Sequence, residues 1–208
     1  MPLANSISIP KVGELILWKV DEEKEWFIDR LSLSSKLWAD YSLIESEVIR
    51  LRWLSSRYAL QLASKKSPLH FNKTPSGKPF FEEDGLQECS LSHCMDYVAA
   101  ICGKKPVGID VERTNRPVSR IQHYFLNPDE IRLFEDSNTD LIVAWSAKES
   151  IFKCLGINTL DFKSQIRITK INGISQVLEF HVSALDLDKT YQVPFSIDSE
   201  KVLTWVIG

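Results

Sequence analysis

Alternating apolar and polar residues near the C-terminus limit what this chain can fold into. Because successive side chains of a strand point to opposite faces of its sheet, an alternation with period two predicts strands with one apolar face. Turn-forming residues such as Asn172-Gly173 separate the alternating segments, and short connections favour antiparallel pairing. The pattern therefore predicts an antiparallel sheet. Its strands are expected at residues 165–171, 176–185, 191–197 and 201–207.

A long helix is expected before these strands, and the same order of elements is predicted earlier in the chain. Apolar residues recur at helical spacing through 139–155 and through 42–63, where Ser42 is a candidate N-cap and Glu45 follows three residues later. Strand, long helix and several strands thus occur twice. Shorter helices are expected at 118–125 and 127–134, and strands at 13–20, 70–72, 79–81, 90–93, 98–102 and 107–112.

The doubled order predicts the fold class. We expect an α+β fold of two similar halves, a pseudo-dimer in which each half is a small antiparallel sheet packed against a long helix. The boundary is placed at Lys104-Lys105-Pro106, which gives an N-terminal half at 1–104 and a C-terminal half at 105–208. The active site is expected at the junction of the two halves.

Composition narrows the class of protein. Apolar residues make up 44% of the chain and charged residues 25%, as in ordinary globular proteins, and the formal charge of −3 gives no overall attraction to nucleic acid. The N-terminus lacks the basic and apolar regions of a signal peptide, and no run is long enough to cross a bilayer. The four cysteines have no CxxC spacing and no histidine at zinc-ligand spacing, which indicates reduced thiols. We therefore expect a cytoplasmic enzyme that binds neither nucleic acid nor membrane.

Charged residues interrupt the apolar pattern of the second long helix in the stretch WSAKESIFKCLG. Spacing by four places Trp145, Glu149 and Lys153 on one face, beside Phe152. The ordinary interpretation is a solvated face, where such a Glu-Lys pair stabilises a helix by roughly 0.2–0.5 kcal/mol. In the other interpretation the two charges border the core, where they cost desolvation energy unless charged ligands lie between them. That interpretation predicts a metal ion for Glu149 and a phosphate for Lys153.

Two more acidic residues lie in the segment VGIDVE, residues 107–112. Asp110 and Glu112 are two apart in a predicted strand, so both side chains point to the same side of the sheet. A solvated strand end is the ordinary alternative for this short motif. Adjacent carboxylates otherwise need a cation, and their oxygens favour a hard one such as Mg²⁺. Together with Glu149, the pair predicts a Mg²⁺ site.

Four motifs in sequence order connect the chain to a known family. They are GKP at 77–79, SH at 92–93, GIDVE at 108–112 and WSAKESIFK at 145–153. This order resembles that of the 4′-phosphopantetheinyl transferases, and the length and the two halves resemble the monomeric Sfp-type branch. The resemblance implies a monomer that transfers the phosphopantetheine arm of coenzyme A to a serine of an apo acyl or peptidyl carrier protein, with Mg²⁺, releasing adenosine 3′,5′-bisphosphate. Such carriers serve fatty acid, polyketide or nonribosomal peptide biosynthesis.

The resemblance also implies roles for individual residues. Asp110, Glu112 and Glu149 would hold Mg²⁺, and Lys153 would reach the same phosphates. The serine proton would pass to Glu149, to a metal-bound water or to Glu130. The residues expected at coenzyme A, besides Lys153, are Arg50 or Arg57 with Ser92 and His93 at the 3′-phosphate, Lys78 and Pro79 beside the nucleotide, and Lys148 in an assisting position.

Two other functions remain as alternatives. A Mg²⁺-dependent nuclease or other phosphoryl-transfer enzyme would also gather acidic residues and a lysine, but Arg113 and Thr114 follow Glu112 where such nucleases carry an ExK triplet. An inactive homologue that only binds carrier proteins would be expected to lack one of the three metal carboxylates. Arg113, Arg116 and Arg120 form a local basic patch, which predicts either docking of an acidic carrier protein or simply solvated arginines.

Overall fold

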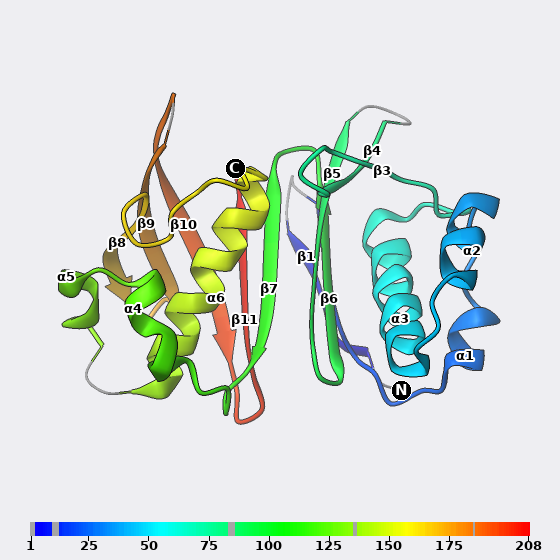
Figure 1. Cartoon of the computed structure of the whole chain (residues 1–208), viewed down its shortest axis with the longest axis horizontal. Helices are drawn as coiled ribbons and strands as arrows, with labels where there is room; N and C mark the ends of the chain where they lie inside the picture. Colours follow the sequence, from blue (N-terminus) through cyan, green and yellow to red (C-terminus); the bar gives the residue numbers. More distant parts are fainter. Residues whose placement is uncertain (1–2, 10–12, 83–85, 135–136, 185) are drawn as a thin grey trace. The chain divides into compact units, whose positions relative to one another are not determined.

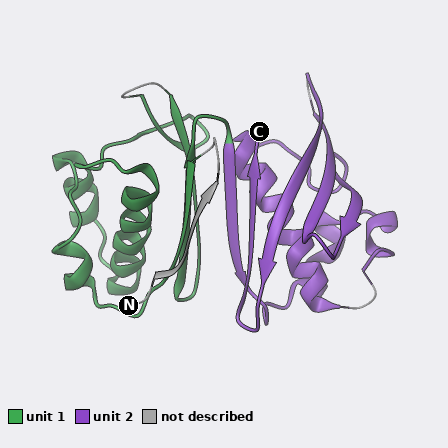
Figure 2. Ribbon diagram, turned by 180° about the vertical axis from the view of Figure 1, so that it is seen from behind, with its two compact units in different colours: residues 1–106 green, residues 107–208 purple. Residues whose placement is uncertain are grey.

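Two compact units make up the chain, Met1–Pro106 and Val107–Gly208 (Figure 2). The computed structural model describes residues 3–9, 13–82, 86–134, 137–184 and 186–208. Each unit contains an antiparallel sheet and a long helix packed against it, which confirms the predicted α+β class with two halves (Figure 1). Within the described residues, no helix combines the length and apolar character that a membrane crossing requires.

The first unit is a six-stranded sheet covered on one face by helices. The strand order is β1-β2-β6-β5-β4-β3, and α3 packs on β2, β5 and β6. Leu54 and Leu60 of α3 are fully buried against Val98 and Ala100 of β6. The elements are β1 (Leu3–Ile9), β2 (Gly13–Lys19), α1 (Lys24–Ile28), α2 (Ser35–Ser42), α3 (Glu47–Ser64), β3 (Asn72–Lys73), β4 (Pro79–Phe81), β5 (Gln87–Cys94) and β6 (Tyr97–Gly103).

The helix predicted at 42–63 begins later in the structure, at Glu47 of α3, and Ser42 belongs to a separate helix, α2. Ser42 ends α2, where its hydroxyl donates to the Ala39 carbonyl at 2.7 Å, and α3 begins at Glu47 after Ser46. The apolar pattern was misleading here because Leu43 is 80% exposed and therefore packs on no core. Strand β1 and helices α1 and α2 were not predicted.

The second unit is a five-stranded sheet with α6 packed on β7, β10 and β11. The strand order is β7-β11-β10-β9-β8 (Figure 1). Every predicted strand of this half is present, each within a few residues of its expected bounds. The elements are β7 (Val107–Arg113), the 3₁₀ helix η1 (Val118–Ile121), α4 (Gln122–Phe125), α5 (Pro128–Ile131), α6 (Asn138–Leu155), β8 (Ile166–Asn172), β9 (Val177–Ala184), β10 (Leu187–Ile197) and β11 (Lys201–Ile207).

Small and hydroxylated residues let α6 lie unusually close to β7 and β11. A Cβ on Gly108 of β7 would meet the Ser150 carbonyl oxygen of α6 at 1.9 Å, so only glycine fits there. Thr204 of β11 forms hydrogen bonds with the hydroxyls of Ser146 (3.0 Å) and Ser150 (2.7 Å), and all three residues are fully buried. Because side chains two apart in a strand share a face, Asp110 lies on the same face as Gly108, toward α6.

Candidate functional site

Asp110 and Lys153 form an ion pair between β7 and α6. The Lys153 ammonium donates to Asp110 Oδ1 at 2.7 Å and to the Ile109 carbonyl at 3.2 Å. Asp110 is buried, while Lys153 is half-buried. The predicted metal carboxylate thus already has a cation of the protein beside it.

Glu112, the second carboxylate of β7, has its own protein cation. Its Oε1 accepts a hydrogen bond from the Arg116 guanidinium and one of 3.0 Å from Trp145 Nε1. The guanidinium carbon of Arg116 also lies 5.2 Å from the centre of the Trp145 ring. Arg116, which the sequence assigned to a carrier-docking patch, therefore contacts the acidic cluster itself.

Glu149, the third predicted carboxylate, lies on α6. Burial raises the pKa of its half-buried carboxyl, the nearby charge of Asp110 raises it further, and Lys153 and Arg116 partly oppose the rise. No hydrogen bond to Glu149 is found among the described residues. Glu149 is thus electrostatically coupled to Asp110, Lys153 and Arg116.

The donor chemistry of this cluster fits Mg²⁺, which binds carboxylate oxygens. The arrangement differs from a metal centre, however, because no three His, Cys, Asp or Glu side chains converge on one point within the part of the chain that is described. Lys153 and Arg116 balance the charge of Asp110 and Glu112 instead. The three carboxylates could hold the ion only if these cations gave way.

Lys148 and Glu130 do not lie where the resemblance implied. Lys148 is 0% exposed and Glu130 is 2% exposed. The Lys148 ammonium donates to both Glu130 oxygens at 2.9 Å and to the carbonyls of Phe125 (2.7 Å) and Phe162 (2.8 Å). Burial lowers the pKa of Lys148 to about 8. The four internal bonds of Lys148 compete with any contact to coenzyme A, and its assisting role stays a prediction.

Glu130 is equally occupied by the protein. Besides Lys148, it accepts hydrogen bonds from the backbone N–H groups of Ile168 (2.6 Å) and Asn127 (2.9 Å), the latter as part of a capping box at the start of α5. These bonds tie α5, α6 and the edge strand β8 together. Glu130 therefore has a structural role in this unit, and its role as general base stays a prediction.

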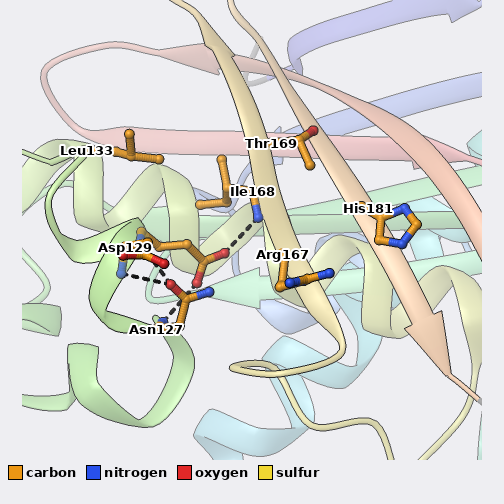
Figure 3. Close-up of a pocket in the computed structure, with 8 residues that line it drawn as sticks. Asn127, Asp129, Leu133, Arg167, Ile168, Thr169 and His181 are labelled. Carbon is orange, nitrogen blue, oxygen red and sulfur yellow. Dashed lines mark hydrogen bonds between the residues drawn. The ribbon is translucent and has the colours of Figure 1, made fainter.

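A cavity of about 400 Å³ lies beside this buried pair. Figure 3 shows Asn127, Asp129 and Leu133 on the α5 side and Arg167, Ile168, Thr169 and His181 on the β8–β9 side, with dashed hydrogen bonds to the capping box and to Ile168. The three predicted metal carboxylates do not line it. The cavity is thus separate from the β7–α6 cluster.

The two arginines predicted for the 3′-phosphate differ in their surroundings. Arg50 donates to the Ile44 carbonyl at 2.6 Å and to Glu47 at 2.9 Å, so it is bound at the start of its own helix. The guanidinium of Arg57 lies 4.1 Å from the centre of the Trp53 ring, and burial lowers its pKa to about 10. Its Nε has no hydrogen-bond partner in the described part of the chain. Arg57 is therefore the stronger candidate for binding an anion.

The remaining predicted residues of the first unit do not form one cluster. Lys78 forms an ion pair with Glu88, and Pro79 begins β4. Ser92 is buried and His93 is exposed, and as neighbours in β5 they point to opposite faces of the sheet. Their side chains therefore cannot approach one phosphate from the same face of the sheet, and their joint role stays a prediction.

Sequence reasoning missed the contacts of Arg116 and of Trp145 with Glu112. The segment after β7 folds back on itself, with the Arg116 N–H donating to the Arg113 carbonyl at 3.1 Å and Asn138 donating to the Arg116 carbonyl at 3.1 Å. The turn-forming pair Thr114-Asn115 was the available signal. It indicates a reversal but not which side chain returns to the strand.

A family comparison covers the half that contains the cluster. A model of the 4′-phosphopantetheinyl transferase superfamily matches residues 106–204. The 4′-phosphopantetheinyl transferase gsp of Aneurinibacillus migulanus is 28% identical over 109 residues, which are 50% of this chain and 45% of that protein. The chain thus spans about half the length of this curated relative.

A solved structure covers a similar share of the chain. The crystal structure of Thermotoga maritima holo-[acyl-carrier-protein] synthase is 24% identical, covers 49% of this chain and 62% of that chain, and has a TM-score of 0.38. The matched family segment coincides with the second unit and contains both the GIDVE strand and the WSAKESIFK helix. The second unit is thus the part of the chain that is similar to the 4′-phosphopantetheinyl transferase superfamily.

Proposed function

We propose that this protein transfers the 4′-phosphopantetheine arm of coenzyme A to a serine of an apo acyl or peptidyl carrier protein. The observation that carries the proposal is the β7–α6 cluster, in which Asp110 and Glu112 face a helix bearing Glu149 and Lys153. This cluster lies within the segment that the superfamily model matches.

The reaction is a phosphoryl transfer. The serine oxygen forms a bond to the phosphorus that carries the pantetheine, and the bond from that phosphorus to the bridging pyrophosphate oxygen breaks. Adenosine 3′,5′-bisphosphate leaves with the bond electrons, and the serine gives up its proton. Catalysis of such a transfer is mostly positioning and stabilisation of negative charge.

The chain offers a donor set for the metal and two groups for the chemistry. Asp110, Glu112 and Glu149 would hold Mg²⁺, which supplies positive charge at the phosphoryl oxygens when bound. Lys153 is only half-buried, so its ammonium is placed to move from Asp110 to a phosphate oxygen. With Glu130 occupied internally, the Glu149 carboxylate is this chain's candidate acceptor for the serine proton.

For the nucleotide end we propose Arg57. A stacked guanidinium without a hydrogen bond at Nε would gain a charge-assisted bond from a phosphate. Replacing Arg57 by Lys keeps the charge but loses the planar stack, so it should weaken coenzyme A more than dephospho-coenzyme A. Equal weakening of both ligands would mean that Arg57 only packs on Trp53.

One incubation tests the proposed function. The protein is mixed with coenzyme A, Mg²⁺ and a panel of apo acyl and peptidyl carrier proteins, and each carrier is weighed by mass spectrometry. We expect at least one carrier to gain the mass of the arm, and the gain to disappear with excess chelator or without coenzyme A. A panel in which no carrier gains this mass would contradict the proposal.

A further inference from the structure

We propose that Arg116 is a built-in counter-ion that a divalent cation must displace from Glu112, and that the displaced guanidinium then binds the phosphate ligand. The proposal rests on the proposed function, because it assigns a regulator of metal affinity to the same cluster. Its starting observation is that Arg116 and Trp145 both donate to Glu112 Oε1.

Glu112 needs a positive partner in this position. Its side chain is only 12% exposed, and an ionised carboxylate that is largely removed from water is costly unless it is paired. Trp145 supplies a neutral donor at 3.0 Å, so the compensating charge comes from Arg116. Arg116 and Trp145 thus both occupy Oε1, one of the two oxygens that Glu112 could offer to a metal ion.

The loop holds Arg116 in this place. Asn138 at the start of α6 donates to its carbonyl at 3.1 Å, and its guanidinium lies over the Trp145 ring. The other two arginines of the segment, Arg113 and Arg120, have different surroundings. Arg113 is 3.9 Å from Glu200, and Arg120 is exposed with no ion pair in the described part of the chain. Arg116 donates to Glu112 and so contacts the acidic cluster directly.

A metal ion and the Arg116 guanidinium exclude one another at Glu112. Two unit charges of like sign 4 Å apart repel by about 4 kcal/mol at an effective dielectric constant of 20, and a divalent ion repels more strongly. The guanidinium must therefore move when the ion binds. Its planar set of donors matches phosphate oxygens, so a pyrophosphate that enters with the metal offers it a new partner. Metal and phosphate binding are thereby coupled through one side chain.

Binding of Mn²⁺ alone tests the first half of this proposal. Titration calorimetry without coenzyme A compares the wild type with Arg116→Gln and with the matched control Arg120→Gln, which removes the same charge from the same segment. We expect Arg116→Gln to bind Mn²⁺ about tenfold more tightly, within the usual range of coupling between sites, and Arg120→Gln to stay near the wild type. Equal affinities in the two variants, weaker binding by Arg116→Gln, or no Mn²⁺ binding by any of the proteins would overturn the proposal.

Inorganic pyrophosphate tests the second half. In the presence of saturating Mg²⁺, Arg116→Gln should bind pyrophosphate more weakly than the wild type, although it binds the metal more tightly. These opposite signs distinguish displacement from a merely structural arginine, whose loss would weaken both ligands together. Arg116→Lys, which keeps the charge, should restore much of the wild-type pattern.

Tryptophan emission reports the displacement without any activity assay. Mg²⁺ should change the emission of the wild type because Arg116 leaves the ring of Trp145, and the change should be lost in both Trp145→Phe and Arg116→Gln. A response that persists in Arg116→Gln would contradict the displacement. Carrier modification in the mass assay with no tightening in Arg116→Gln would refute this inference alone, whereas tightening without any carrier modification would refute the proposed function alone.

Discussion

The long helices α3 and α6 are both 18 residues long and each packs on an antiparallel sheet, but their buried polar groups behave differently. In α3 the buried hydroxyls of Ser55 and Ser56 bond back to a carbonyl of the same helix, that of Arg52, at 3.1 and 2.7 Å. In α6 the buried hydroxyls of Ser146 and Ser150 bond across to the sheet instead. The first helix is held to its sheet mainly by apolar packing, the second also by directed bonds.

This difference indicates why the functional cluster lies on the second helix. Apolar packing tolerates small shifts, whereas hydrogen bonds and a glycine contact fix the distance and rotation of a helix relative to a strand. Catalytic groups need to be held within a fraction of an ångström. The crossing of α6 and β7 therefore has the rigidity that Glu149, Lys153 and Asp110 need. The apolar packing of α3 carries no such groups and does not require it.

The largest effect should come from removing a carboxylate of the cluster. Asp110→Ala or Glu149→Ala should lower transfer by on the order of 1,000-fold, the upper scale for loss of one preorganised electrostatic group, with the circular dichroism of the fold retained. Ser56→Ala on α3, a buried polar residue bonded only within its own helix, is the matched control. If Ser56→Ala reduces transfer as much as Asp110→Ala, the claim that catalysis depends on the α6–β7 crossing and not on α3 is wrong.

The next effect tests the buried ion pair of α6. Lys148→Met leaves Glu130 buried with an uncompensated charge, so unfolding in urea should show a loss of about 3–5 kcal/mol. Lys153→Met, on the same helix but half-buried, should lose clearly less. Equal losses would mean that the four internal bonds of Lys148 add no stability beyond that of the half-buried Lys153.

The close approach of α6 to β7 can be tested with glycine. Gly108→Ala puts a Cβ at 1.9 Å from the Ser150 carbonyl oxygen, so the helix must shift, at a cost of about 1–3 kcal/mol. Gly173→Ala, where nothing lies within 4 Å of the added Cβ, should change stability little. Transfer should also fall in Gly108→Ala, because the shift separates Glu149 from Asp110. Retention of both stability and activity would show that the contact does not fix the helix.

The sequence predicted the regular parts of the second unit well because their periodicity reports burial directly. In β9, at Val177–Ala184, buried residues alternate with more exposed ones without interruption. The start of α3 was predicted wrongly because Leu43 and Val48 are apolar but 80% and 75% exposed. Periodicity counts apolar residues whether or not a core covers them.

The site was predictable in its residue types but less so in its pairings. Lys148 stands at helical spacing with Leu141, Ala144 and Ile151, all of them buried, so its burial could have been inferred from the helix face alone. The contact between Arg116 and Glu112 could not, because it depends on the path of a loop rather than on a period. Ser92 and His93 were treated as one motif, although strand geometry alone separates neighbouring side chains.

A smaller effect concerns the cost of Glu149 to the stability of the fold, which should depend on pH. Burial and the charge of Asp110 raise the pKa of Glu149, so its protonated form stabilises the fold at low pH, and this contribution is lost as pH rises from the unfolded value through the raised one. Glu149→Gln has no charge to bury, so its free energy of unfolding should exceed that of the wild type by about 0.5–2 kcal/mol at neutral pH without metal. Urea unfolding at pH 4 and pH 7.5 should show a gain that grows with pH. A gain that is constant or reversed would contradict the electrostatic account.

The smallest effect compares how the two helices end. Both finish on a residue in the left-handed region, Lys65 with φ of 58° after α3 and Gly156 with φ of 65° after α6. Glycine adopts this conformation freely, whereas a side chain costs about 1 kcal/mol there. Lys65→Gly should therefore stabilise the protein by somewhat less than 1 kcal/mol, because it also loses the exposed ion pair with Glu14, and Gly156→Ala should destabilise it by about 1 kcal/mol. Thermal unfolding of the two variants should shift the midpoint in opposite directions. Shifts of the same sign would mean that the left-handed backbone conformation does not determine how these substitutions change the stability of the two helix ends.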